Sequence, residues 1–62
     1  MIQFTNEHGN KTAIAVNKIM AIEYRDKNTT NILVGPRLWI CVTESYELVL
    51  YRIETYFNEL GE

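Results

Sequence analysis

The only nucleophile and base that the sequence could pair are Cys41 and His8. A catalytic cysteine needs a thiolate in an electropositive, partly exposed place with an imidazole beside it. Cys41 instead lies between Ile40 and Val42 in an apolar run, and His8 falls among turn-forming residues. We therefore expect a small, half-buried thiol and an exposed histidine, and we do not expect a thiol enzyme.

Paired carboxylates that could serve as general acid and base occur twice, as Glu23 with Asp26 and as Glu44 with Glu47. The first pair flanks a polar stretch with interleaved basic residues, which is typical of a solvated turn. The second pair lies where a helix is expected to begin, and the positive end of a helix stabilises negative charge. The glycines are isolated, and no Cys and His residues have metal-ligand spacing. We expect no catalytic, cofactor-binding or metal-binding residue, and no enzyme.

Basic residues form another candidate set, since Arg25, Lys27 and Arg37 all fall in predicted loops or strand ends. Basic loops close to aromatic residues can contact phosphates and stack on bases. However, acidic residues are interleaved with these three. The sequence pI is about 5.3, whereas dedicated nucleic-acid binders usually have a pI above about 9. Nucleic-acid binding is kept as the alternative hypothesis only.

The elements that must position these residues are short. Alternating apolar residues predict strands at about 1–5, 11–16, 19–24, 31–34 and 37–43. The apolar spacing then changes to that of a helix, predicted over 44–60, with Thr43 or Ser45 as its cap and Gly61 at its end. The sequence thus predicts one α+β domain. It has a small, mostly antiparallel four- or five-stranded sheet, a meander or partly closed barrel, with one C-terminal helix packed on one face.

The same alternation assigns residues to faces. On the strands, the residues expected to face the core are Met20, Ile22, Tyr24, Leu38, Ile40 and Val42. On the helix, the inward stripe is expected to be Tyr46, Val49, Leu50, Ile53, Phe57 and Leu60. One helix covers one face of a sheet, so apolar residues remain on the other face and on the outer side of the helix. These candidate interface residues are Ile19, Leu33, Trp39, Cys41, Leu48 and Tyr51.

Size and composition favour self-association. The 62 residues are 47% hydrophobic and include a single cysteine, so no disulfide within the chain can stabilise the monomer. Scaling rules give about 95 kcal/mol from apolar burial against about 93 kcal/mol of lost conformational entropy. Oligomerisation is the usual remaining source of stability for so small a domain. We expect a homo-oligomer, with another protein as a further possible partner.

Charge and hydropathy bear on location and partners. Residues 1–43 contain five basic and three acidic residues, whereas residues 44–62 contain five glutamates and one arginine. This charge polarity favours head-to-tail or helix-to-sheet contacts with a complementary surface, and it is too weak to demand a nucleic-acid partner. The first residues lack the basic start of a signal peptide, and the longest apolar run, Leu38 to Val42, is too short to span a membrane. We expect a cytoplasmic protein without a membrane span.

The chain resembles the short flagellar and swarming-motility protein family (FlbD-like) over nearly its whole length. The shared features are Met1-Ile2 with Thr5, Gly9, Asn17, Ile22-Glu23, Thr30 with Ile32, Gly35, Ile40 with Val42, and Glu44-Ser45-x-Glu47 leading into a helix with Val49 and Ile53. The resemblance implies a small non-enzymatic accessory or regulatory protein.

A second resemblance is to LytTR-type DNA-binding domains. It is carried by the strand Ile22-Glu23-Tyr24, the basic loop Arg25 to Asn28, and a closing strand followed by a helix rich in Leu and Glu. It implies DNA contacts from Arg25, Lys27 and Arg37. The expected function is therefore a small non-catalytic interaction or regulatory protein acting as a homo-oligomer. A DNA-binding transcriptional regulator is the alternative.

Overall fold

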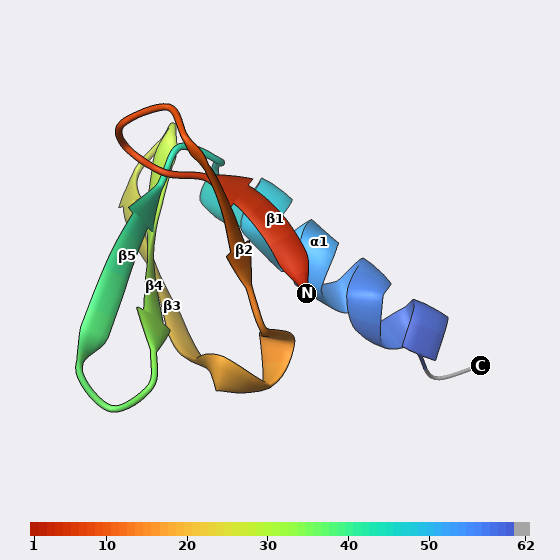
Figure 1. Cartoon of the computed structure of the whole chain (residues 1–62). Helices are drawn as coiled ribbons and strands as arrows, with labels where there is room; N and C mark the ends of the chain where they lie inside the picture. The colour runs from red at the N-terminus through yellow and green to blue at the C-terminus, as the bar shows by residue number, and fades with distance from the viewer. Residues whose placement is uncertain (61–62) are drawn as a thin grey trace.

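A computed structural model describes residues 1–60 and contains five antiparallel strands and one C-terminal helix (Figure 1), so the predicted α+β class is confirmed. The strands are β1 (Ile2–Thr5), β2 (Lys11–Ile14), β3 (Ile19–Asp26), β4 (Thr29–Val34) and β5 (Leu38–Val42). A single 3₁₀ turn, Val16–Lys18, connects β2 to β3, and helix α1 spans Tyr46–Leu60.

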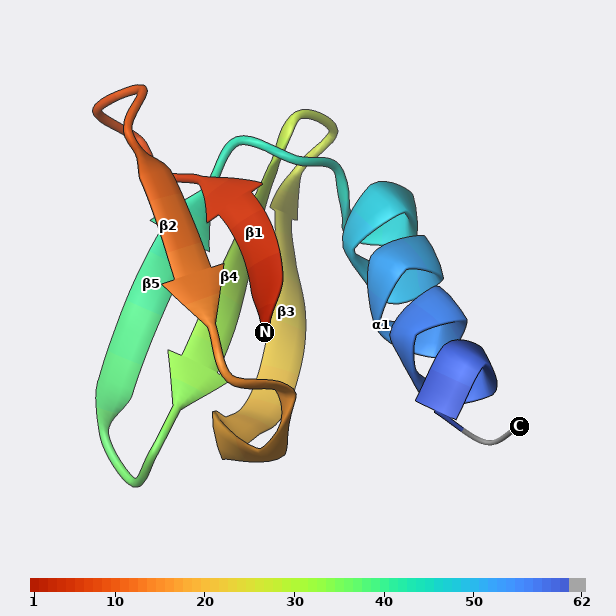
Figure 2. The same cartoon turned by 45° about the vertical axis from the view of Figure 1, so that its right-hand side comes forward.

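The strands form two sheets and not the single sheet expected from the sequence. The β1–β2 hairpin is one sheet, and the meander β3–β4–β5 is the other. The sheets meet at an isolated bridge between Asn6 and Val42, and the Thr43 N–H donates to the Thr5 carbonyl over 2.8 Å. Helix α1 packs against β1, β3 and β4, on the side of the molecule away from β5 (Figure 2). The strands therefore make an open, partly wrapped structure and not a closed barrel.

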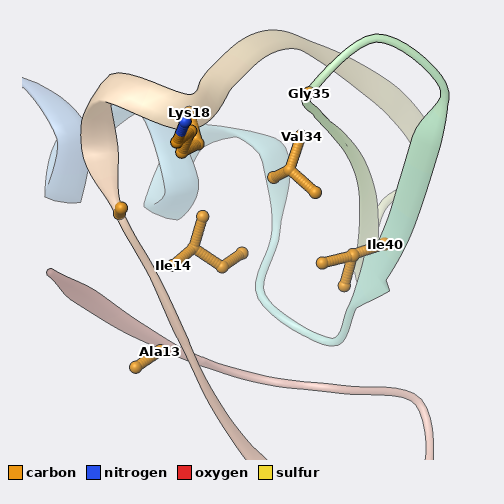
Figure 3. Close-up of a pocket in the computed structure, with 7 residues that line it drawn as sticks. Ala13, Ile14, Lys18, Val34, Gly35 and Ile40 are labelled. Carbon is orange, nitrogen blue, oxygen red and sulfur yellow. The ribbon is translucent and has the colours of Figure 1, made fainter.

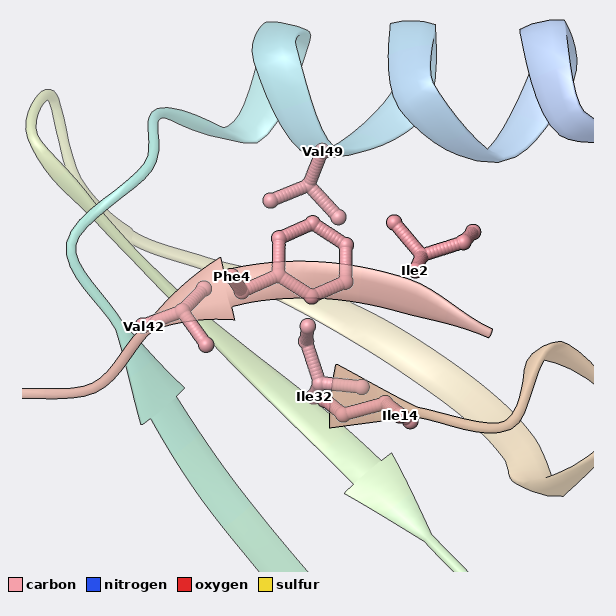
Figure 4. Close-up of a cluster of buried hydrophobic side chains, with 6 residues drawn as sticks. All are labelled: Ile2, Phe4, Ile14, Ile32, Val42 and Val49. Carbon is pink, nitrogen blue, oxygen red and sulfur yellow. The ribbon is translucent and has the colours of Figure 1, made fainter. Parts of the chain in front are cut away.

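The core lies between the two sheets and the helix. Figure 4 shows the Phe4 ring surrounded by side chains from β2, β4, β5 and α1. The fully or almost fully buried apolar residues are Ile2, Phe4, Ile14, Ile32, Val42 and Val49. Burying apolar surface is the main favourable term in folding, so this small cluster is the principal source of stability in the monomer.

Strand β3 differs from the simple alternation that the sequence predicted. Ile19 pairs with Val34 but Ala21 pairs with Leu33, so the register shifts at Met20. A bulge of this kind adds one residue and reverses the faces that follow it. As a result Ile19 packs on the core with Ile22, while Met20 is exposed, so the prediction that Met20 faces the core was wrong. Tyr24 stays on the same face as Ile22, since it pairs with the buried Thr30, but it lies beside Tyr46 and is 57% exposed.

The segment 25–30, which lies between two predicted strands, is mostly strand and not loop. Asp26 pairs with Thr29, so β3 and β4 are joined by only Lys27 and Asn28. The Asp26 carboxylate accepts the Asn28 N–H over 2.9 Å, a local bond that lets Asp and Asn form tight turns. At the other end of β4, Gly35 has a φ of +70°, which is a conformation that favours glycine.

Helix α1 begins two residues later than predicted. The Leu48 N–H binds the Ser45 Oγ over 3.2 Å, so Ser45 is the cap, whereas the Thr43 hydroxyl donates to Thr5. Phe57 was expected to face the core but is 55% exposed, and Tyr56 packs on the core instead. Leu38, at the open end of β5, is also exposed and not buried as predicted. Gly61 and the Leu60 side chain lie outside what the structure describes.

Candidate interaction surface

The outer side of the β3–β4–β5 sheet carries a row of apolar residues. Ala21 pairs with Leu33, and Leu33 pairs with Trp39, so the three lie next to each other across the strands. Their neighbours Ile22, Ile32 and Ile40 contact the core, and successive side chains of a strand point to opposite faces. We call Ala21, Leu33, Trp39 and Cys41 the Trp39 face.

The Trp39 face is partly open to solvent and has a polar rim. Trp39 is 47% exposed, and Leu33 and Cys41 are half-buried. Next to the apolar row, Asn31 pairs with Glu23 on one side and Cys41 on the other. An exposed aromatic residue with a polar rim is the usual composition of a protein-interaction surface.

Cys41 and His8 make no catalytic pair within residues 1–60. The Cys41 sulfur accepts a hydrogen bond from Arg25 Nη1 over 3.1 Å, and no hydrogen bond joins it to His8 in that range. His8 is exposed in the β1–β2 turn, where its N–H donates to the Asn6 side chain over 2.9 Å. The Cys41 thiol therefore has a cationic neighbour, Arg25, but no neighbouring group that accepts its proton.

The remaining predicted interface residues lie elsewhere. Ile19, expected on the second face, packs against the core because of the bulge in β3. Leu48 and Tyr51 are exposed on α1, which lies on the far side of the molecule from β5 (Figure 2). Tyr51 borders a groove with Met1, Ile2 and Gln3 of the β1 side. The structure therefore brings Leu33, Trp39 and Cys41 together and separates them from the helix residues.

The three predicted nucleic-acid contacts do not form one basic surface. Arg25 and Lys27 belong to the β3–β4 end of the sheet, and Arg37 belongs to the β4–β5 turn at the opposite end. The six residues of β4 lie between these ends, which is about 20 Å at ~3.3 Å per residue. Arg25 is in addition occupied by the Cys41 sulfur. The cations therefore lack the clustering that phosphate contacts need.

An apolar groove of about 310 Å³ opens between the two sheets, close to β5. Figure 3 shows Ile14, Val34 and Ile40 pointing into it from β2, β4 and β5, respectively. Lys18 and Gly35 border it, and the Gly35 N–H donates to the Lys18 carbonyl over 3.0 Å. The groove contains no pair of acidic or basic side chains that could carry out acid–base chemistry.

A cluster that the sequence did not reveal lies at the free edge of β1. The buried Glu44 carboxylate accepts the Thr5 N–H, with both oxygens at 3.0 Å, and its Oε2 lies 3.5 Å from Arg52 Nη1. Arg52 Nη1 also donates to the Gln3 carbonyl over 2.9 Å, and its guanidinium lies 5.8 Å from the centre of the Phe4 ring. The only sequence signal was an arginine between Val49 and Tyr56 on the inward side of the helix. Glu44 and Arg52 thus bond the backbone groups of β1 that a neighbouring strand would otherwise bond, so the cluster has a structural role.

Metal sites and membrane spans are two further kinds of feature that bear on function. Residues 1–60 contain no group of three or more His, Cys, Asp or Glu side chains placed to hold a metal ion. No helix there is both long and apolar enough to cross a membrane. No protein-family model, curated protein or solved structure matches the chain.

Proposed function

We propose that this chain is a small non-catalytic interaction module that acts as a homo-oligomer, with its contact centred on Trp39. Such a module regulates or assists a larger protein assembly through a binding surface formed by its associated copies, and it catalyses no reaction. It requires an exposed apolar anchor, a polar rim and a fold that holds the anchor rigidly.

The exposure of Trp39 is the observation that carries this proposal. Aromatic residues supply much of the binding energy of protein interfaces, since one ring buries about 150–250 Å². Trp39 is held on a three-stranded sheet beside Leu33, while the helix covers a different side of the molecule. Trp39 is 47% exposed, whereas Phe4, beneath the helix, is 1% exposed.

The proposal is tested by comparing Trp39→Ala with Tyr51→Ala. Both substitutions remove an exposed aromatic ring, and Tyr51 is 67% exposed on the helix, away from the Trp39 face. Light scattering of the wild-type chain should give a mass above 7.3 kDa that rises with concentration. Trp39→Ala should return it to the monomer mass, and Tyr51→Ala should behave as wild type.

Two results would contradict the proposal. One is a wild-type mass of 7.3 kDa at every concentration up to the millimolar range. The other is an equal loss of self-association in both variants, because this would show a general effect of removing surface aromatic rings. Circular dichroism of the two variants confirms that each remains folded before the masses are compared.

A further inference from the structure

The apolar groove between the two sheets is a concave site that the proposed self-association does not use. Ile14, Val34 and Ile40 point into it from three different strands (Figure 3). The Trp39 face lies on the other side of the β3–β4–β5 sheet, because side chains alternate along a strand. The groove is completed by Ala13, Ala15, Lys18 and Gly35. Among these described residues, Lys18 alone has a polar side chain.

An aliphatic lining determines which part of a ligand can enter the groove. A hydroxyl, amide or charged group placed against aliphatic side chains loses its hydrogen bonds to water and gains none. An alkyl chain loses no hydrogen bond, and it removes apolar surface of Val34 and Ile40 from water, which is favourable. The volume of about 310 Å³ is at the small end of the range for ligand sites, about 300–1,000 Å³. The groove therefore suits one short aliphatic chain.

Lys18 places a positive charge at the border of this groove. It ends the 3₁₀ turn, where its N–H donates to the Ala15 carbonyl over 2.9 Å and its own carbonyl accepts the Gly35 N–H over 3.0 Å. Both partners also line the groove, so the backbone of Lys18 is fixed to two of its walls. The Lys18 side chain is exposed and makes no ion pair with another residue in the range 1–60.

The charges near the groove are positive and not balanced by acidic residues. Arg37 is exposed and follows Gly35 by two residues, in the β4–β5 turn. Asp26 lies at the far end of β3, and Glu7 lies in the β1–β2 turn, beside the Val42 end of β5. No acidic residue is among the described residues that line the groove. An anionic headgroup would therefore be attracted to this end of the molecule and a cationic one repelled.

We propose that the groove binds a free fatty acid with a single short aliphatic chain. The chain lies between Ile14, Val34 and Ile40, and the carboxylate pairs with the Lys18 ammonium. The aliphatic walls select the chain, and the unpaired cation at the border selects the sign of the headgroup. This site is separate from the Trp39 face, so the inference stands or falls independently of the proposed self-association.

Octanoate is the probe, and the backbone amide NMR spectrum of the isotope-labelled wild-type chain is the readout. We expect saturable shifts at the amides of Ile14, Val34, Gly35 and Ile40, with a dissociation constant on the order of millimolar for so small a ligand. Octylammonium has the same chain and the opposite charge, and it should bind about five-fold more weakly or worse. Equal affinities of the two probes would overturn the inference, because aliphatic surface alone would explain them.

Lys18→Glu and Lys27→Glu are matched variants for the headgroup contact. Both reverse the charge of an exposed lysine, and the eight residues of β3 separate the two positions. Lys18→Glu should weaken octanoate binding by about five-fold or more and make octylammonium the preferred probe. Lys27→Glu should change neither affinity by more than about two-fold. Equal effects of the two variants, or none in Lys18→Glu, would overturn the pairing with Lys18.

Val34→Thr tests where the chain lies. Threonine keeps the branched shape of valine but adds a hydroxyl to the wall of the groove. The variant should weaken octanoate binding by about three-fold, and circular dichroism confirms that it remains folded. Unchanged affinity, or shifts of the wild type confined to Leu33 and Trp39 on the opposite face, would place the chain elsewhere and overturn the inference.

Discussion

At the residue scale, Glu44 and Arg52 replace the strand that β1 lacks on one side. The Glu44 carboxylate is buried and binds the Thr5 N–H, and Arg52 joins this carboxylate to the Gln3 carbonyl while lying over Phe4. A buried carboxylate is costly unless it is paired and hydrogen-bonded, and here both conditions are met. The two side chains thus fix helix α1 to β1 and close this edge to other strands.

Glu44→Gln should lower the free energy of unfolding by about 1.5–3 kcal/mol, because an amide loses the charged hydrogen bonds to Thr5 and Arg52. Urea denaturation followed by circular dichroism measures the change. Glu54→Gln is the matched control, since Glu54 is exposed on helix α1 and its substitution should change stability by less than about 0.5 kcal/mol. Equal effects in the two variants would show that the Glu44 cluster does not stabilise the fold.

Asp26 provides a pH-dependent test of the β3–β4 turn. The backbone N–H of Asn28 donates to the Asp26 carboxylate and lowers the pKa of that carboxyl below its ordinary value. Because the pKa is lower in the folded chain, its contribution to stability is present above the unfolded-state pKa and is lost as pH falls through the folded-state pKa. NMR titration should give a lower midpoint for Asp26 in the folded chain than in urea. Identical midpoints would contradict the turn geometry.

At the element scale, the helix and the order of strands could be predicted because their signals are local. The spacing of Val49 and Ile53 indicates an inward stripe, and the alternation through Ile40 and Val42 places Trp39 on the opposite face. The bulge at Met20 could not be found in this way. One inserted residue leaves the pattern of apolar residues plausible in either register, and the pairing of Ile19 with Val34 decides between them.

The part of the candidate site on regular strands could be predicted from the sequence, and the part that depends on how the helix packs could not. Leu33, Trp39 and Cys41 belong to two regular strands, so alternation alone assigns them to one face. Leu48 and Tyr51 required the position of the helix relative to β5, which no local pattern contains. The Glu44–Arg52 cluster was also missed, because an acid before a helix is equally typical of a solvated helix end.

The junction of β5 and α1 gives a prediction for the helix start. Ser45→Ala removes the acceptor of the Leu48 N–H and should cost about 1 kcal/mol of unfolding free energy. Ser45→Asp supplies another acceptor and should restore most of the loss. Thermal denaturation of the three proteins measures these differences. If Ser45→Ala is as stable as wild type, the helix begins elsewhere.

At the scale of the whole molecule, the open structure explains why a chain of 62 residues is expected to need a partner. In the part of the chain that the structure describes, six apolar side chains are buried in the core, and a groove between the sheets stays open. Leu38 and Trp39 on β5 are exposed.

Sedimentation equilibrium of the wild-type chain over a range of concentrations tests self-association most directly. For a homo-oligomer we expect a mass that rises above 7.3 kDa as the concentration passes through the micromolar range and above. A single species of 7.3 kDa throughout, including millimolar samples, would contradict it.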